Sequence, residues 1–403
     1  MRILIIHNYY QQRGGEDTVV ATESALLRAR GHEVELLTFH NDSIAGWKKA
    51  LYLFKSIYNP AAARQVRARI GAFRPDVVHV HNFFYVASPA IFYAARQAGV
   101  PVVMTLHNYR LICPSAFLYH EGQVYEESID KIFPLQAIRK RVWNGSLIQT
   151  ASIVAITGIH KLLGTFRTKV DRYIVFTEFA RQLFLRSSLG VGEEKLYIKP
   201  NFVEDQGAAD APREDYYLFI GRLSPEKGIA TLLDAVRRLK VPVVVLGDGP
   251  MRAEVEACAA QYPHLRYLGP RPRTEVLEHM RRCRALIFPS LWYEGMPMVI
   301  VEALSTGCPV LLSRLGNPMH MIEDGTVGLH FAPGDAADLQ RCVERIEADP
   351  ALRARMGQAA RTSYEQHYSP DANYDLLMQL YRSLAAGAGV PQPSLATNSQ
   401  AKT

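Results

Sequence analysis

Two polar clusters in the second half of the chain have the residue types and the spacing for chemistry. The first is the octet Gly221–Gly228, which follows an apolar run and contains Arg222 and Lys227. The second places Glu294 and Glu302 at the two ends of an apolar stretch. Two cations near a helix start can neutralise a diphosphate, and carboxylates can accept hydrogen bonds from sugar hydroxyls. Together the clusters indicate a nucleotide sugar as the substrate.

The charge of a departing diphosphate has to be neutralised as it develops. Some enzymes use a metal held by an Asp-x-Asp pair, and the sequence contains no such pair. Arg222 offers a fork of donors and Lys227 a compact positive charge, while Gly221 permits close approach of the backbone. A helix expected to begin near Lys227 would add its N-terminal dipole. We therefore expect these cations, with no metal and no cofactor, to bind the diphosphate.

The glutamate cluster suits a sugar nucleotide in a second way. Glu302 lies in an apolar segment expected to be helical over Pro297–Ser305, where a carboxylate is costly unless it has a partner. The paired hydroxyls of a ribose would satisfy it. A proline fits the first turn of a helix, so the amides of Gly295 and Met296 would face a bound anion. Glu294, just before this turn, could accept hydrogen bonds from the transferred sugar.

Short apolar strands that alternate with longer amphipathic segments position these clusters, a pattern typical of a parallel sheet wrapped by helices. Strands are expected near Ile3–His7, Glu33–Thr38, Val77–Val80, Pro101–Leu106, Tyr173–Phe176 and Leu196–Lys199, and then near Tyr217–Ile220, Val243–Leu246, Leu265–Leu268, Ala285–Phe288 and Val310–Leu312. The predicted fold is α/β, with two doubly wound Rossmann-like domains that face a central cleft. The expected domains are 1–200 and 215–368, with a linker at 201–214, a helix at about 369–385 that joins the first domain, and a disordered tail at 387–403.

Composition agrees with two soluble domains and excludes several classes of protein. The chain has 403 residues, of which 48% are hydrophobic and 21% are charged. No apolar run reaches the roughly 18 residues of a membrane span. Five widely spaced cysteines indicate free thiols in a reducing cytoplasm. Residues 1–200 hold 25 Lys and Arg against 15 Asp and Glu, which favours an anionic substrate or membrane surface; no nucleic-acid-binding pattern is present.

Residues 129–169 mix basic with apolar side chains, including Arg139, Lys140, Arg141 and Lys161. Such a stretch can lie in the interface of an anionic membrane with its apolar side down. The alternative is a set of helices that pack on the domain core and keep a basic outer face. The first interpretation predicts a cytoplasmic protein in peripheral contact with the inner face of the membrane.

In combination, the octet, the run Gly247–Pro250, the run Phe288–Ser290 and the Glu294-x7-Glu302 spacing resemble the pattern of glycosyltransferase family 4, whose members are retaining, metal-independent enzymes of the GT-B fold. The similarity runs from Gly14 to Asp335. It implies that Arg222 and Lys227 bind the donor diphosphate, Glu302 the ribose, and Glu294 and His107 the donor sugar. The residues that it implies for catalysis are Arg222, Lys227, Glu294 and His107, and those for donor binding are Gly14, Gly15, Gly221, Asp248, Gly295, Met296, Met298 and Glu302.

Three histidines lie near strand ends in the first half. His107 ends a strand and would point into the cleft, and it is followed by Asn108 where the family usually has Asp. His79 and His81 share one face of a strand, but a metal site needs a third ligand and none is evident. Packing is expected for His79, and both packing and cleft lining stay open for His81.

No carboxylate in the first half stands out as a nucleophile or base. The resemblance implies a front-face route, in which the leaving phosphate helps to deprotonate the acceptor hydroxyl. The function expected is transfer of a hexose from a nucleoside diphosphate sugar to a glycan or lipid-linked acceptor, in cell-surface polysaccharide or glycolipid synthesis. Two alternatives are a transferase for a small soluble acceptor and a catalytically silent protein that binds sugar nucleotides.

Overall fold

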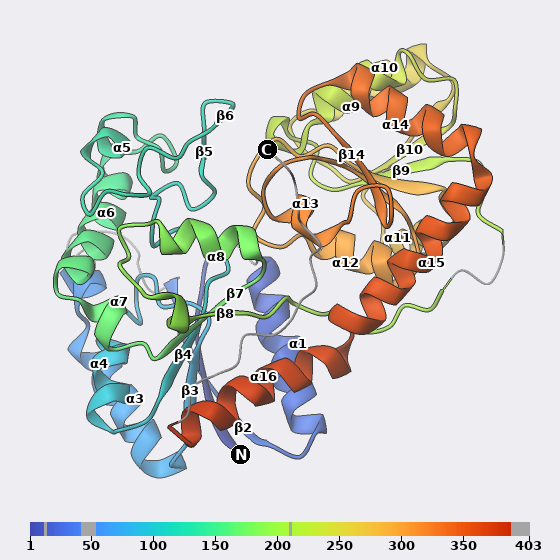
Figure 1. The fold of residues 1–403 in the computed structure, drawn as a ribbon. Coiled ribbons are helices and arrows are strands. Elements are labelled where there is room, and N and C mark those ends of the chain that lie inside the picture. The colour runs from blue at the N-terminus through green and yellow to red at the C-terminus, as the bar shows by residue number, and fades with distance from the viewer. Residues whose placement is uncertain (12–13, 42–53, 209–211, 388–403) are drawn as a thin grey trace. The chain divides into compact units, whose positions relative to one another are not determined.

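Two six-stranded parallel sheets organise the protein, which is described here by a computed structural model of residues 1–11, 14–41, 54–208 and 212–387. Of these residues, one compact unit contains Met1–His120, Tyr125–Lys199 and 374–387, and the other contains Glu121–Val124 and Pro200–Asn373. Figure 1 shows both sheets and their helices. The tail expected at 387–403 lies outside the described residues apart from its first residue, as do residues 209–211 of the expected linker.

The first sheet has the strand order β2-β1-β3-β4-β7-β8. Its strands are β1 (Arg2–Tyr9), β2 (Glu33–His40), β3 (Val77–Val80), β4 (Val102–Thr105), β7 (Arg172–Val175) and β8 (Leu196–Ile198). The accompanying helices are α1 (Gly15–Ala29), α3 (Pro60–Phe73), α4 (Ala90–Gln97), α5 (Leu135–Arg139), α6 (Leu147–Leu162), α7 (Thr165–Thr168), α8 (Glu178–Leu185) and α16 (Pro370–Ala385). A 3₁₀ turn, η3 (Glu193–Lys195), and a short strand pair, β5 (Tyr119–His120) and β6 (Gln123–Val124), complete the elements of residues 1–199, and β6 belongs to the segment Glu121–Val124 that is grouped with the second unit.

The second sheet has the order β11-β10-β9-β12-β13-β14. Its strands are β9 (Tyr217–Ile220), β10 (Val243–Leu246), β11 (Leu265–Gly269), β12 (Ala285–Phe288), β13 (Val310–Ser313) and β14 (Gly328–Phe331). The helical elements are η4 (Pro225–Lys227), α9 (Ile229–Val236), α10 (Arg252–Gln261), α11 (Arg273–Arg282), α12 (Met298–Ser305), α13 (Gly316–Met321), α14 (Ala336–Ala348) and α15 (Pro350–His367). Two apolar clusters hold this unit together, one beneath α9, α10 and α14 and the other beneath α11, α12 and α15.

The predicted α/β class with two doubly wound Rossmann-like domains is confirmed, because both sheets are wholly parallel and are covered by helices. The strand β14 was not anticipated. Only four residues long, it begins at Gly328, whose Cβ would lie 2.0 Å from the carbonyl oxygen of Val310 in β13. The glycine therefore permits the pairing of these strands, although it weakens the strand pattern in the sequence.

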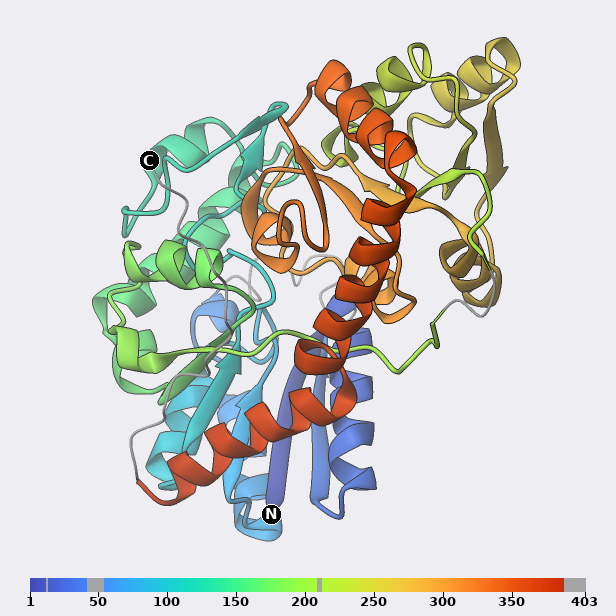
Figure 2. The same cartoon turned by 45° about the vertical axis from the view of Figure 1, so that its right-hand side comes forward.

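The last helix packs on the first sheet. Its residues Leu377, Met378, Leu380 and Tyr381 share an apolar cluster with Ile3 and Ile5 of β1 and with Val20 and Leu27 of α1. Figure 2 shows α16 running across the strands of this sheet. The residues from 374 onward therefore complete the core of the unit that begins at the N-terminus.

Each sheet reverses its strand order at one point, and ligands of such sheets bind beyond the carboxyl ends of the strands at that point. In the second sheet, β9 and β12 are neighbours at the reversal, and in the first sheet β1 and β3 are. The loops after β9 and β12 hold both polar clusters singled out in the sequence. The loop after β1 holds Gly14, and His81 directly follows β3.

Candidate active site

The loop after β9 brings Lys227 to the reversal point of the second sheet. Residues Pro225–Lys227 form a 3₁₀ turn, and α9 begins at Ile229. The helix expected to begin near Lys227 therefore begins two residues later, at Ile229. Gly228 separates the turn from the helix with φ +73°, and a Cβ there would lie 1.8 Å from the carbonyl oxygen of Pro289. Both the left-handed backbone and the contact with the loop after β12 require glycine.

Lys227 meets Glu294 across these two loops. The Nζ of Lys227 donates to Glu294 Oε1 at 2.6 Å, and the Oγ of Ser290 donates to the same oxygen at 2.8 Å. The ring of Trp292 lies 5.1 Å from the ammonium. Glu294 is 7% exposed, so its charge needs these donors. Its Oε2 makes no hydrogen bond to any described residue, which leaves one carboxylate oxygen for a ligand.

A buried asparagine holds the backbone around Glu294. The Nδ2 of Asn317, in α13, donates to the carbonyl oxygen of Glu294 at 2.8 Å and also to that of Gly295. Asn317 is buried, and Gly316 beside it has φ +61° and would place an added Cβ 2.9 Å from the ring of Tyr293. The carbonyls of the loop therefore point toward α13, and the loop is held in one conformation.

Arg222 lies on the rim of a pocket of about 270 Å³ at the carboxyl ends of β9, β10 and β11. The pocket is lined by Ile220, Gly221, Arg222, Leu246, Gly247, Asp248, Pro270, Arg271 and Val276. Arg222 is exposed, with no ion pair to any described residue. Asp248 is exposed too, and its Oδ1 accepts from the amide of Gly249 at 2.8 Å. Arg222 is thus available to an anion, whereas one oxygen of Asp248 is used to shape its own turn.

The glycines of the run Gly247–Pro250 serve the packing of loops. A Cβ on Gly247 would lie 1.9 Å from the carbonyl oxygen of Gly221, and one on Gly249 would lie 2.4 Å from that of Leu223. The loops after β9 and β10 therefore lie in direct backbone contact. This contact explains the Gly-Asp-Gly spacing without any ligand.

Glu302 lies in α12 and faces α11. Its Oε1 is 2.8 Å from Arg273 Nη2. Burial raises the pKa of the Glu302 carboxyl above its ordinary value, and Arg273 offsets part of this shift. The arginine side chain is 58% exposed, so the pair is weakly stabilising. The structure thus holds a carboxylate that lacks full compensation, as the sequence predicts for a ligand-binding group.

The remaining residues of the second cluster have structural partners. Pro297 precedes α12 with an extended backbone, so the expectation that it lies in the first helical turn is wrong by one residue. Met296 Sδ accepts from the amide of Asn201 at 3.0 Å, and Met298 packs on the core with it. Their side chains are therefore turned into the domain.

In the first unit, the glycines after β1 stand at the start of α1. No described atom lies within 4 Å of a Cβ built on Gly14 or Gly15, so the fold itself does not require glycine there. The carboxylate of Asp17 accepts from the amide of Gly14 at 3.0 Å and lies 2.8 Å from His7 Nε2. This carboxylate fixes the entry of the chain into α1.

His107 is held by a second histidine. Its Nε2 lies 2.9 Å from His81 Nδ1, and its Nδ1 makes no hydrogen bond to any described residue. Burial lowers the pKa of His107 well below its ordinary value and that of His81 to about 3. Both rings are therefore neutral near pH 7. Packing and cleft lining were both open for His81. Its side chain is 3% exposed, which favours packing.

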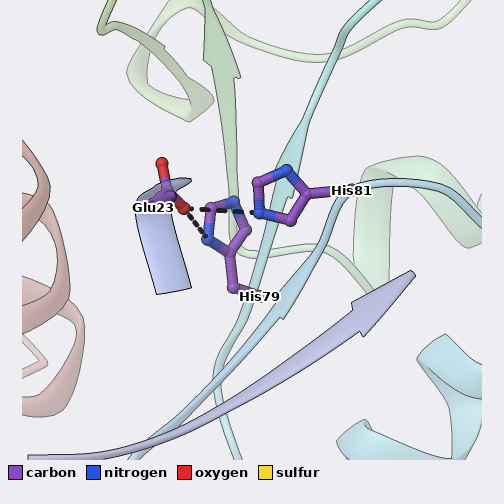
Figure 3. Close-up of side chains that lie close together, drawn as sticks. All are labelled: Glu23, His79 and His81. Atoms are coloured by element: carbon purple, nitrogen blue, oxygen red, sulfur yellow. Dashed lines mark ion pairs between the residues drawn. The ribbon is translucent and has the colours of Figure 1, made fainter. Parts of the chain in front are cut away.

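Sequence reasoning missed a third side chain beside His79 and His81. Glu23, from α1, points at both rings, as Figure 3 shows. Its Oε1 lies 3.1 Å from His79 Nδ1 and 3.3 Å from His81 Nε2, so a set of three candidate metal ligands exists where none was evident. The two ring nitrogens of His79 are hydrogen-bonded to Tyr381 and Thr105. Lys199 compensates the charge of Glu23 at 2.9 Å, so the cluster resembles a buried hydrogen-bond network more than a metal site.

A signal for Glu23 was present in the sequence. Val19, Val20 and Leu27 lie three or four residues from it, so it stands on the apolar face of α1. A charged residue on that face predicts a buried partner. The same argument would not have found Ser290 or Asn317, which follow strands and carry no charge.

Comparison with protein families identifies the two halves. Residues 13–206 match the family model described as "Glycosyltransferase Family 4", and residues 204–363 match "Glycosyl transferases group 1". The two matches together span most of the chain and meet near the boundary between the units.

Individual relatives agree with this result. The chain is 26% identical to a glycogen synthase of Mycobacterium tuberculosis over 93% of this chain and 84% of that protein. It is 25% identical to a phosphatidyl-myo-inositol mannosyltransferase of Mycolicibacterium smegmatis over 97% of this chain and 95% of that protein.

Solved structures share the fold at lower identity. The crystal structure of Anabaena HepE in complex with UDP has a TM-score of 0.66 at 17% identity and covers 96% of this chain and 100% of its own. Sucrose-phosphate synthase from Thermosynechococcus elongatus has a TM-score of 0.66 at 18% identity, with the same coverage. The resemblance seen in the sequence is confirmed: this chain is an enzyme of the glycosyltransferase family 4, with the GT-B fold.

Proposed function

We propose that the enzyme moves a hexose from a nucleoside diphosphate sugar to a glycan or lipid-linked acceptor with retention of configuration, in cell-surface polysaccharide or glycolipid synthesis. The observation that carries the donor assignment is the pair of Lys227 and Glu294 at the reversal point of the second sheet. Nearby, Arg222 makes no ion pair to a described residue, and the charge of Glu302 is only partly compensated by Arg273. Structures of Anabaena HepE with UDP and with UDP-glucose support a nucleotide sugar as the donor.

The proposed roles follow from the available atoms. Lys227 pairs with Glu294, and the diphosphate of the donor would compete for the same ammonium. Arg222, which makes no ion pair to a described residue, would bind the diphosphate from the rim of the pocket. Glu294 would accept from a sugar hydroxyl with Oε2. Gly14 and Gly15 leave open space that a phosphate can approach, and His107 presents Nδ1 to the donor sugar.

Replacing Glu302 by Gln separates donor binding from stability. Burial raises the folded-state pKa of this carboxyl, so its ionised form disfavours folding at neutral pH, and its removal should not lower the melting temperature of the free protein. A hydrogen bond to a charged group contributes about 1.5–3 kcal/mol, so nucleotide affinity should fall about 10- to 100-fold. Thermal shift with UDP, GDP, ADP and their sugars measures both quantities.

One nucleotide should raise the melting temperature of the native protein, and this rise should shrink in Glu302→Gln. Glu323→Gln, which changes an exposed glutamate of the same unit, is the control and should keep the full rise. No rise with any of the nucleotides would contradict the donor assignment. An undiminished rise in Glu302→Gln would contradict the role of this residue.

Slow hydrolysis of the bound donor tests catalysis without an acceptor. We propose that no metal takes part, because Arg222 and Lys227 supply the charge that a metal would carry. Hydrolysis by the purified enzyme in the presence of a chelator is the expected result. A strict need for an added divalent cation would contradict this part of the proposal, and no hydrolysis or transfer with any bound donor would favour a catalytically silent protein.

The acceptor side carries an exposed apolar and basic surface on α5 and α6. Within it, Ile148, Leu162 and Leu163 are each more than three-fifths exposed, and α6 contains no acidic residue. Arg139, the last residue of α5, and Arg141 are exposed, while Lys140 pairs with Glu127 at 2.7 Å. No helix among the described residues is long and apolar enough to span a bilayer. We propose that this surface contacts an anionic membrane from the cytoplasmic side, where a lipid-linked acceptor would be available.

Neutralising Arg139 and Arg141 to Gln should weaken binding to anionic vesicles. Each basic residue near such a surface contributes about 1 kcal/mol, so the pair predicts a loss of roughly 30-fold. Changing Ile148, Leu162 and Leu163 to Ser should weaken binding to neutral vesicles as well. Cosedimentation measures both effects, and Arg64→Gln with Arg67→Gln on α3 is the control for net charge. Equal binding to anionic vesicles by the control and by the Arg139/Arg141 variant would contradict membrane contact through this surface. The helices would then only pack on the domain core and keep a basic outer face.

A further inference from the structure

A continuous line of buried side chains connects Lys199 to the candidate active site. Lys199 Nζ lies 2.9 Å from Glu23 Oε2, Glu23 Oε1 lies 3.3 Å from His81 Nε2, and His81 Nδ1 lies 2.9 Å from His107 Nε2. Lys199, Glu23 and His81 are each at most 3% exposed. They come from the end of β8, from α1 and from the end of β3, so only the fold brings them together.

Two atoms in this line, Glu23 Oε1 and His81 Nε2, have few possible hydrogen-bond partners. Neither Glu23 Oε1 nor His81 Nε2 makes a hydrogen bond of good geometry to any described residue, and the two atoms lie 3.3 Å from each other. The neighbouring His79 Nδ1, which also faces Glu23, is 2.6 Å from the hydroxyl of Tyr381. This His79 nitrogen is closer to Glu23 Oε1, at 3.1 Å, but it already has the Tyr381 hydroxyl as a partner. Because a buried polar atom left without a hydrogen bond is costly, we infer that Glu23 Oε1 and His81 Nε2 pair with each other.

We propose that Glu23 is a positioning residue, which acts through His81 to fix the tautomer and the orientation of His107. A carboxylate can only accept, so His81 carries its proton on Nε2 and accepts with Nδ1. His107 then donates from Nε2 and presents the lone pair of Nδ1. His107 is thereby set to accept a hydrogen bond from a hydroxyl of the bound sugar, a statement that rests on the proposed function.

The ion pair between Lys199 and Glu23 fixes which atoms in this line donate hydrogen bonds and which accept them. Lys199 is a donor only, so it occupies one oxygen of Glu23 and keeps the carboxylate ionised in the core. The pKa values of His81 and His107 are lowered by burial, so neither ring takes up a second proton near pH 7 that would erase the preference. The charge that faces the two rings from the neighbouring elements is that of Glu23, which is paired with Lys199, and His7 and His79 are further titratable groups beside them.

Glu23→Gln should reverse the donor and acceptor roles in the hydrogen bonds that run from residue 23 through His81 to His107. Lys199 would bind the amide oxygen, which leaves the amide NH₂ to donate to His81 Nε2. His81 would then carry its proton on Nδ1, and His107 would be protonated on Nδ1. Long-range ¹H–¹⁵N correlation of the ¹⁵N-histidine-labelled full chain reads the tautomer of His107, which is assigned by its loss in His107→Ala. The native protein should show Nε2–H, Glu23→Gln should show Nδ1–H, and Tyr381→Phe, which alters only the partner of His79, should match the native protein.

Kinetics supply the second readout. A reactive group displaced from its productive geometry can cost up to about 100-fold, so Glu23→Gln should lower kcat/KM about 10- to 100-fold, and Tyr381→Phe by less than about 3-fold. In a His107→Ala background, Glu23→Gln should cause no further loss, because its effect passes through His107. Should Glu23→Gln fail to fold, His81→Phe breaks the line and leaves the Lys199–Glu23 ion pair in place.

The outcomes separate this inference from the proposed function. An Nδ1–H tautomer of His107 in the native protein, or an unchanged tautomer in Glu23→Gln, overturns the inference whatever the activity. Additive losses in Glu23→Gln and His107→Ala overturn it as well, since they would mean general damage to the unit. A correct tautomer in a protein that binds no nucleotide sugar would leave the line in place and overturn the proposed function.

Discussion

Replacing Lys227 by alanine is expected to lower kcat by about 100- to 1,000-fold while donor affinity falls far less, since removal of one preorganised donor to a developing charge has an effect of this size. The ammonium has Glu294 as a partner at 2.6 Å. Binding of the donor therefore exchanges one anion for another, and the net gain is small. In the transition state the charge on the departing phosphate is greatest, and there the ammonium contributes most.

Single-turnover rates and donor dissociation constants measure the two effects separately. Lys240→Ala, which removes an exposed lysine just beyond α9, is the control and should leave both values unchanged. Lys227→Ala also leaves the buried Glu294 with Ser290 as its side-chain donor, so melting temperatures have to be compared. Equal losses in rate and affinity would show that Lys227 binds donor and transition state alike, against the mechanism proposed here.

Replacing Gly228 by alanine is expected to destabilise the second unit by about 3–5 kcal/mol, because strain and overpacking add at this position. The backbone has φ +73°, and the new Cβ would lie 1.8 Å from the carbonyl oxygen of Pro289. Relief requires the loops after β9 and β12 to separate. Since these loops carry Lys227 and Glu294, donor binding should be lost together with stability.

The chain offers a matched control in Gly325, which has φ +78° but no atom within 4 Å of a built Cβ. Gly325→Ala should therefore show the backbone cost alone, about 1–2 kcal/mol. Urea unfolding followed by tryptophan fluorescence measures both variants, since Trp292 lies in the loop that is expected to move. Equal destabilisation of the two would mean that the contact with Pro289 contributes nothing.

The fold was predictable to a large extent because its signals are local. Apolar runs such as Val243–Leu246 and Ala285–Phe288 lie on the observed strands with the predicted bounds. Predictions that depended on helix ends were less accurate. Lys227 and Pro297 each precede their helix, because Gly228 interrupts the first and the extended backbone of Pro297 delays the second.

The sequence pattern identified charged residues of the candidate site but not the neutral residues that contact them. Arg222, Lys227, Glu294 and Glu302 stand out as charges beside or within apolar segments. The roles of Ser290 and Asn317 depend on where two further loops lie, which no local pattern expresses. The two glycines of the Gly-Asp-Gly turn are required by the backbones of neighbouring loops, a contact that no local pattern expresses, and donor binding by Asp248 stays a prediction.

The sequence by itself determined the fold class and the family and singled out the charged residues of the candidate site, because apolar periodicity and short motifs are properties of adjacent residues. Tertiary structure decided which atoms those charges meet. It paired Lys227 with Glu294 and brought Glu23, His81 and His107 into one line from three separate elements. Such pairings depend on the parallel order of strands, which places residues distant in the chain at one edge of a sheet, and sequence spacing carries no measure of that distance.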